Sequence, residues 1–224
     1  MGAFLRRIAV AVVAGLLTAA VGASTGLAGM NDGGGFYAAT APGGGLLASI
    51  ADCGGYGAGT QVFRPWFDFA DYSLAPQGDL ASTSDWSLDG ATVSSAHDPY
   101  GLSAGSLVFA HNGDTATTPW MCVNLLDPTI RFLTVDRGGW GFGSLVVVLR
   151  YVAPDGSVQR LPIGIAPAGR SWQPTLPSVL VMNLLSVAST NGWTAVSLEL
   201  HAVGLTAGET VSADGFYVDP CRSR

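Results

Sequence analysis

The stretch Ala195-Val-Ser-Leu-Glu-Leu-His-Ala202 decides the fold of this 224-residue chain, because apolar and polar side chains alternate in it at every step. Successive side chains of a β-strand point to opposite faces of a sheet, whereas the apolar face of a helix repeats every 3.6 residues. The stretch therefore predicts a strand with one face turned toward a core. Its inward side chains are expected to be Val196, Leu198 and Leu200, and its outward side chains Ser197, Glu199 and His201.

Three further runs have strand character. In Thr129 to Val135, the side chains of Ile130 and Phe132 share one face and the intervening residues share the other. Leu145 to Val152 is β-branched and apolar on both faces, which is typical of a central strand of a sandwich. The last run, Asp214-Gly-Phe-Tyr-Val-Asp-Pro-Cys221, carries acidic residues near both ends. Strands rather than helices should therefore dominate the fold.

Turn signals separate these runs at short spacing. They are Asn112-Gly-Asp114, Pro154-Asp-Gly156, Asn191-Gly192 and Ala213-Asp-Gly215. Ser178 to Ala188 is long enough for a short helix, but Pro174 and Pro177 precede it and Val is frequent, so we expect it to be extended. Short strands punctuated in this way predict an all-β protein, an antiparallel jelly-roll β-sandwich.

The N-terminal segment is typical of a secretory signal. Arg6 and Arg7 precede the apolar stretch Ile8 to Val21, and small residues then allow cleavage after Ala23, with Ala28 as the alternative. An uncleaved membrane anchor is the other interpretation, because no charge occurs from Ile8 to Asn31. The second half of that stretch is only weakly apolar, which favours cleavage. We expect a protein that is secreted, extracellular or in the cell envelope, without a membrane segment after cleavage.

The chain divides into three predicted parts: a signal peptide at 1–23, a flexible lead rich in Gly and Ala at 24–62, and one β-sandwich domain at 63–224. Without Arg6 and Arg7, eight Arg face sixteen acidic residues, and the chain has no Lys. Nucleic acids and anionic lipids require clustered cations, so this balance excludes them as expected partners.

Three cysteines, Cys53, Cys122 and Cys221, permit one internal disulfide and leave one thiol. All three pairings are open from the spacing. A bond between Cys53 and Cys122 would stabilise the domain by roughly 3 to 4 kcal/mol through the unfolded chain. The chain has no Cys-x-x-Cys or Cys/His cluster, which argues against structural zinc.

A series of ordered marks resembles a known group of proteins. The marks are Cys53, Phe63-x-Pro-Trp66, Gly78-Asp-Leu, Trp86-x-Leu, Thr118-Pro-Trp-Met-Cys-Val123, Ile130-Arg-Phe132, Trp172-x-Pro-Thr175 and Asp214-Gly-Phe-Tyr-Val-Asp-Pro220. They resemble small secreted bacterial proteins of unknown function that look like jelly-roll carbohydrate-binding modules. The resemblance covers Cys53 to Pro220. It implies a disulfide between Cys53 and Cys122, and leaves Cys221 as an extra.

The same resemblance implies a structural calcium between the start of the domain and its last strand. Asp79 matches the early acidic ligand and Asp214 the late one, but Ala81 stands where the group has Glu. Calcium takes six to eight oxygen ligands, so the loss of a carboxylate weakens such a site. Calcium at Asp79 and Asp214 is therefore a hypothesis, and no other cofactor is expected.

No catalytic residues are predicted. Gly101-Leu-Ser-Ala-Gly105 matches the Gly-x-Ser-x-Gly pattern of a serine hydrolase, but that motif works on a strand-to-helix turn and here Ser106 to Ala110 continues as a strand. Glu199 and Glu209 are the only glutamates, and Glu199 with His201 is more simply an exposed pair on a sheet than a glycosidase acid. We expect a protein that is not an enzyme.

Aromatic side chains in loops are the candidates for binding, because sugar rings stack on flat side chains. Trp140 lies between glycines, and Tyr100 ends the run His97-Asp-Pro-Tyr100. Trp140 serves either as an exposed contact or as an anchor for its own loop. The first functional hypothesis is a module that binds an extracellular glycan through Trp140, Tyr100, His97 and Arg137. The second is a structural or assembly component of the cell surface that is linked to a partner through Cys221, and a hydrolase is the third.

Overall fold

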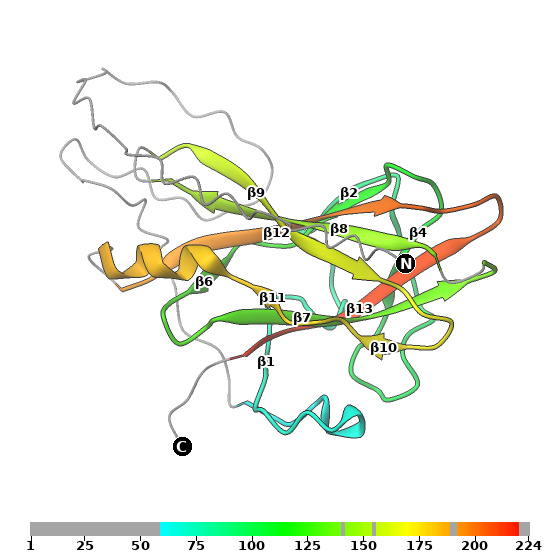
Figure 1. The fold of residues 1–224 in the computed structure, drawn as a ribbon, viewed down its shortest axis with the longest axis horizontal. Coiled ribbons are helices and arrows are strands. Elements are labelled where there is room, and N and C mark those ends of the chain that lie inside the picture. The colour runs from blue at the N-terminus through cyan, green and yellow to red at the C-terminus, as the bar shows by residue number, and fades with distance from the viewer. Residues whose placement is uncertain (1–58, 140–141, 154–155, 189–191, 220–224) are drawn as a thin grey trace, which may run out of the picture. The chain divides into compact units, whose positions relative to one another are not determined.

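The structure is a computed structural model that describes residues 59–139, 142–153, 156–188 and 192–219. Its strands form two antiparallel sheets that lie in two layers (Figure 1). The predicted antiparallel β-sandwich is confirmed, and strands far apart in the sequence become neighbours as the chain crosses repeatedly between the sheets, as in a jelly roll.

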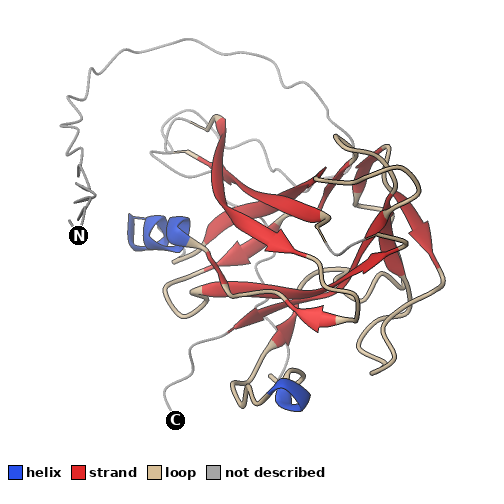
Figure 2. Ribbon diagram, turned by 45° about the vertical axis from the view of Figure 1, so that its right-hand side comes forward, coloured by secondary structure: helices blue, strands red, loops and turns tan. Residues whose placement is uncertain are grey.

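The larger sheet has seven strands in the order β10-β7-β13-β4-β3, with β1 paired to β13 and β11 paired to β7. Their bounds are β1 Ser73–Leu74, β3 Thr92–Ser94, β4 Ser106–Phe109, β7 Thr129–Arg137, β10 Gln173–Pro174, β11 Ser178–Val179 and β13 Thr210–Asp219. The smaller sheet has six strands in the order β2-β5-β12-β8-β9, with β6 paired to β12. Their bounds are β2 Ser87–Asp89, β5 Thr115–Thr117, β6 Met121–Val123, β8 Ser144–Val152, β9 Val158–Pro167 and β12 Thr194–Val203. Figure 2 distinguishes these strands from two short 3₁₀ helices, η1 at Arg64–Trp66 and η2 at Val181–Ala188.

The main core fills the space between the sheets. Val196, Leu198 and Leu200 of β12 are fully buried there, as their alternation predicts. Aromatic rings complete the core, with Phe132 of β7 stacked on Phe216 of β13 at 4.9 Å between ring centroids. Burial of these apolar side chains is the main source of the fold's stability.

A second apolar cluster covers the outer face of the larger sheet. It consists of Phe63, Tyr72, Leu133, Val135, Trp172 and Tyr217. The segment before β1, which includes η1, lies across this face as the cyan part of Figure 1. Arg131 of β7 pairs there with Asp68, and its guanidinium lies 4.8 Å from the Phe63 ring centroid. Arg131, Leu133 and Val135 thus face away from the main core, as predicted for the face opposite to that of Ile130 and Phe132.

Two sequence expectations are wrong. Ser178 to Ala188 is extended only at Ser178–Val179 and then forms the 3₁₀ helix η2. Its buried residues Asn183 and Ser186, together with Leu180 directly before it, are spaced by three, which is the repeat of a 3₁₀ helix. Two of these three residues are polar, so the buried face of the helix has no apolar repeat in the sequence that would have predicted it.

Ala213-Asp-Gly215 is not a turn but part of β13. The register of β13 against β7 shifts between Asp214 and Tyr217, and Gly215 adopts a positive φ of 60°. A β-bulge of this kind inserts an extra residue into a strand and exploits the freedom of glycine. The bulge leaves Phe216 in the main core and turns Tyr217 to the outer face.

Several predictions concern residues outside the described ranges. They include the signal at 1–23, the lead up to 58, Trp140, Cys53 and Cys221. The described part begins at 59, four residues before the fully buried Phe63. No helix within the described ranges combines the length and the apolar content that a membrane crossing requires.

Candidate functional site

The outer face of the smaller sheet carries a cluster of charged and aromatic side chains. Strand register places Glu199 and His201 of β12 on this face, opposite Val148 and Val146 of β8. No cluster of buried apolar side chains covers this face within the described part of the chain. The two faces of the sandwich therefore differ, because the larger sheet is covered and the smaller sheet presents polar groups.

Glu199 is the centre of this cluster. Its side chain is only 13% exposed, and its Oε1 lies 2.8 Å from Nε2 of His201. Its Oε2 accepts a hydrogen bond of 3.0 Å from Nε of Arg160 on β9 and lies 3.9 Å from Nε of Arg150 on β8. Glu199 and His201 do form the predicted pair on a sheet face, but the pair is not exposed, because the two side chains are only 13% and 33% accessible and three partners hold the carboxylate.

Trp120 forms the aromatic side of the cluster. The guanidinium carbon of Arg150 lies 5.1 Å from the centroid of the Trp120 ring, which is a cation–π contact. Thr118, two residues before Trp120, makes four hydrogen bonds with β12. Its amide donates to Leu198 O, its Oγ1 accepts from the Leu198 amide, its carbonyl accepts from Ser197 Oγ, and its Oγ1 donates to Ser197 Oγ. These bonds hold the backbone two residues before Trp120 against β12.

The cluster combines a flat ring with guanidinium donors and a carboxylate acceptor. A sugar offers the complementary groups, because its C–H face stacks on an aromatic ring and its neighbouring hydroxyls both donate and accept hydrogen bonds. Sequence analysis missed this combination: Trp120, Arg150 and Arg160 come from three separate segments, and only the strand register brings them together.

The structure describes three of the four loop residues predicted to bind a ligand, and the fourth, Trp140, lies outside the described ranges. Tyr100 is 47% exposed, and its ring meets Trp66 edge-on at 4.5 Å between centroids. Nδ1 of His97 lies 2.7 Å from the carbonyl oxygen of Asp98. Arg137 lies 5.9 Å from the centroid of the buried Trp172 ring. All three are on the outer side of the larger sheet, and their role in binding stays a prediction.

Asp214 lies beneath this loop as a fully buried carboxylate. Its Oδ2 accepts a hydrogen bond from the amide of Asp98, whereas its Oδ1 has no hydrogen-bond partner among the described residues. Burial, and then the neighbouring charge of Asp98, raise the pKa of Asp214 to about 7. A proton or a cation at Asp214 would relieve this electrostatic cost.

The residues around Asp214 fit calcium only in part. The acidic residue in contact with Asp214 is Asp98, and not the predicted Asp79. The Asp98 carboxylate already accepts hydrogen bonds from three backbone amides, those of Tyr100, Leu102 and Ser103. The side chain of Asp79 instead accepts a hydrogen bond from the Ala81 amide. No group of three His, Cys, Asp or Glu side chains suited to a metal occurs in the described ranges. A structural calcium would have to use Asp214, Asp98 and backbone carbonyls, and it stays a hypothesis.

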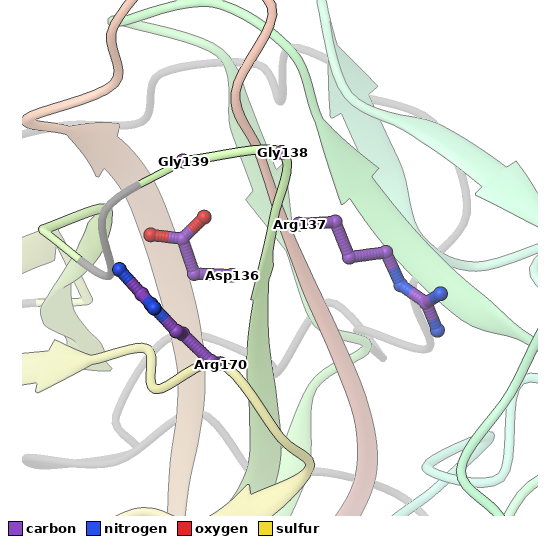
Figure 3. A pocket seen from close by; sticks show the side chains of 5 residues that line it. All are labelled: Asp136, Arg137, Gly138, Gly139 and Arg170. Carbon is purple, nitrogen blue, oxygen red and sulfur yellow. The ribbon is translucent and has the colours of Figure 1, made fainter.

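A second pair of acids lies at the end of β7 and the start of β13. Asp136 and Glu209 are both nearly buried, and a hydrogen bond with the Asp136 side chain, followed by bonds from Thr206, lowers the pKa of Glu209 to about 2. Beside them is a pocket of about 750 Å³ that is lined by Asp136, Arg137, Gly138, Gly139 and Arg170. Figure 3 shows Asp136 and Arg170 on one side of β7 and Arg137 pointing to the other, so the two arginines do not converge on a common ligand.

The Gly-x-Ser-x-Gly pattern does not form a nucleophile elbow. Ser103 is nearly buried, and its hydroxyl bonds to Gly105 O at 2.9 Å and to Asp98 Oδ2 at 3.3 Å. The pattern is followed by β4 rather than by a helix, which the motif requires. Among the cysteines, Cys122 of β6 is disulfide-bonded. Its partner lies outside the described ranges, and the pairing with Cys53 therefore stays a prediction.

Comparison with known proteins finds similarity in structure only. No protein-family model matches the chain, and no curated protein does. The CBM22-1 xylan-binding domain of Xyn10C from Paenibacillus barcinonensis is 13% identical with a TM-score of 0.46, and the match covers 69% of this chain and 97% of that domain. The C-terminal family 22 carbohydrate-binding module of Xyn10B from Clostridium thermocellum is 14% identical with a TM-score of 0.40, over 64% of this chain and 91% of that module.

A third similar structure is of another kind. The enzymatically active domain of tailspike protein 4 from bacteriophage CBA120 is 13% identical with a TM-score of 0.43, and the match covers 64% of this chain but 21% of that protein. The first two belong to the class of jelly-roll modules that the ordered sequence marks resemble.

Proposed function

We propose that the protein is a non-catalytic module that binds a carbohydrate chain through the outer face of its smaller sheet. One observation carries the proposal: Trp120, Arg150 and Glu199 form a continuous chain of contacts on a sheet face that no described apolar cluster covers. We call the side chains of Trp120, Arg150, Arg160, Glu199 and His201 the sheet-face cluster.

The cluster is suited to binding because its groups are held before a ligand arrives. Glu199 is held by Arg160 and His201, and Arg150 is held by Trp120. Side chains that are already ordered lose less conformational entropy when a ligand binds, so more of the contact energy appears as affinity. A sugar ring over Trp120 would place its hydroxyls within reach of the guanidinium and carboxylate groups.

The same contacts favour binding over catalysis. A glycosidase works with a pair of carboxyl groups that face each other across the bond to be cleaved. Glu199 is instead surrounded by two guanidinium groups and an imidazole. These partners suit a carboxylate that accepts hydrogen bonds from sugar hydroxyls. The export signal predicted at 1–23 would bring the module to a glycan on or near the cell envelope.

Affinity electrophoresis through gels that contain soluble polysaccharides tests the proposal. We expect at least one polysaccharide to retard the purified protein, and Trp120→Ala to abolish the retardation while the melting temperature stays close to that of the wild type. Tyr100→Ala is the matched control, because Tyr100 is an exposed aromatic residue on the opposite side of the sandwich.

Three outcomes count against the proposal. One is a failure of every polysaccharide to retard the wild type, and another is full retardation of Trp120→Ala. Loss of retardation in Tyr100→Ala alone would transfer the site to the loop with His97, Arg137 and Trp140, as sequence analysis predicts. Glu199→Gln keeps the shape of the side chain and removes its charge. Loss of retardation in this variant would therefore result from the missing charged acceptor and not from a packing defect.

A further inference from the structure

Arg150 and Arg160 stand directly opposite each other on β8 and β9. Like charges at directly opposed positions of two antiparallel strands destabilise the pairing. Between them lies one carboxylate, that of Glu199, at 3.9 Å from Nε of Arg150 and 3.0 Å from Nε of Arg160. The sheet-face cluster therefore has a net positive charge even when His201 is neutral, and a larger one when His201 is protonated.

This local charge is opposite in sign to that of the whole chain, which is −6 at pH 7. Among the described residues, the other acid that strand register places on this face is Asp89 of β2, two strand spacings, about 10 Å, from His201 on β12. Within the described part of the chain, the cationic region therefore lies over β8, β9 and the adjoining part of β12. An anionic ligand would be repelled by most of the protein and attracted here.

The donors of Arg160 are only partly used. Its side chain is 65% exposed, and its hydrogen bond to Glu199 uses Nε rather than either Nη group. An arginine with free Nη groups binds a carboxylate through two parallel hydrogen bonds, which are stronger than bonds between neutral groups. Arg150 also contacts Trp120. A sugar whose carboxylate pairs with the two arginines can therefore stack its ring on the indole of Trp120 at the same time.

From this arrangement we infer that the ligand of the sheet-face cluster is an acidic polysaccharide, whose sugar rings carry carboxylates that pair with Arg160 and Arg150. The inference rests on the proposed function and narrows it from carbohydrates in general to uronic-acid polymers. Trp120 contacts the ring, Arg160 and Arg150 contact the carboxylate, and Glu199 keeps the two guanidinium groups in position.

The test compares polymers that share a backbone and differ in charge. Polygalacturonate carries free carboxylates, and its methyl ester carries the same sugars without the charge. We expect the purified protein to bind polygalacturonate about tenfold more tightly than the ester, since a hydrogen bond to a charged group contributes more than one to a neutral group. Arg160→Gln should reduce polygalacturonate binding by about the same factor and leave binding of the ester unchanged.

Two controls exclude a general attraction between charges. Arg64→Gln removes the same charge from an exposed arginine of η1, on the other side of the sandwich, and should not change binding. Polyglutamate supplies carboxylates without sugar and should not bind, because it offers no ring to Trp120.

The outcomes separate the inference from the proposed function. Equal affinity for polygalacturonate and its ester, with both lost in Trp120→Ala, overturns the acidic ligand and keeps carbohydrate binding. Binding of polyglutamate, or equal effects of Arg64→Gln and Arg160→Gln, shows attraction of any polyanion and also overturns the inference. If no polysaccharide binds at all, both claims are wrong.

Discussion

Replacing Asp214 with Asn should change the dependence of stability on pH more than any other single substitution that we consider. The carboxylate is fully buried, its Oδ1 has no described hydrogen-bond partner, and the acid Asp98 adjoins it. Burial first, and then the charge of Asp98, raise its pKa from 3.8 to about 7. The folded protein therefore holds a proton at Asp214 over a pH range where the unfolded chain has lost it.

The sign and the size of the effect follow from linkage. A raised pKa of an acid means that the free energy of unfolding falls as pH rises from about 4 to about 7, and then levels off. The difference between a pKa of 3.8 and one of about 7 corresponds to at most about 4 kcal/mol of stability. Asn imitates the protonated acid and cannot ionise. Asp214→Asn should therefore match the wild type near pH 4 and exceed its stability by up to about 4 kcal/mol above pH 7.

Urea denaturation across this pH range in the presence of EDTA measures the difference directly. Asp85→Asn, at an exposed carboxylate, serves as the control and should change stability little at any pH. A gap between the wild type and Asp214→Asn that stays constant with pH would refute the reasoning. The calcium hypothesis adds a second arm: millimolar calcium should stabilise the wild type above pH 7 and leave Asp214→Asn unchanged, and no shift with calcium would exclude a structural ion at this position.

Three other substitutions test the packing. Gly78→Ala would place a Cβ 2.4 Å from the carbonyl oxygen of Phe216 in β13, so we expect a loss of about 1 to 3 kcal/mol in urea denaturation, and unchanged stability would contradict this contact. Asp68→Ala would leave the nearly buried Arg131 without its carboxylate and should lower the free energy of unfolding by about 3 kcal/mol, with Asp68→Asn recovering part of the loss in the same assay. Phe67 is 87% exposed and has a positive φ of 62°, a conformation that costs a residue with a side chain about 1 kcal/mol. Phe67→Gly should therefore leave the melting temperature nearly unchanged. A large drop would show that the ring packs against the domain.

The alternation in β12 predicted both the strand and the direction of its side chains. That prediction succeeds because a period of two is set locally by backbone geometry, and burial of Leu198 then follows from its face. The helix η2 was missed because its buried positions include the polar Asn183, whose Nδ2 donates to Asp127 O. A hydrogen bond to a distant segment leaves no local signal in the sequence.

The sheet-face cluster was beyond sequence analysis for a related reason. Arg150 and Arg160 become neighbours only through the register of β8 and β9, and that register contains a shift between Val147 and Val148. A slip of one residue would turn these side chains to the other face. Trp120 joins them because β6 pairs with β12, a contact between segments about 70 residues apart. Alternation predicts the face of a side chain, but not its neighbours across the sheet.

The most direct test of binding through the smaller sheet is an NMR titration of the isotope-labelled protein with an oligogalacturonate. Binding through the smaller sheet predicts that the indole N–H signal of Trp120 and the amide signals of Arg150 and Glu199 shift together and saturate with one affinity. It also predicts that the signals of His97 and Tyr100, on the other side of the sandwich, stay in place. Shifts confined to the loop that contains His97 and Tyr100, or no shifts at saturating ligand, would contradict it.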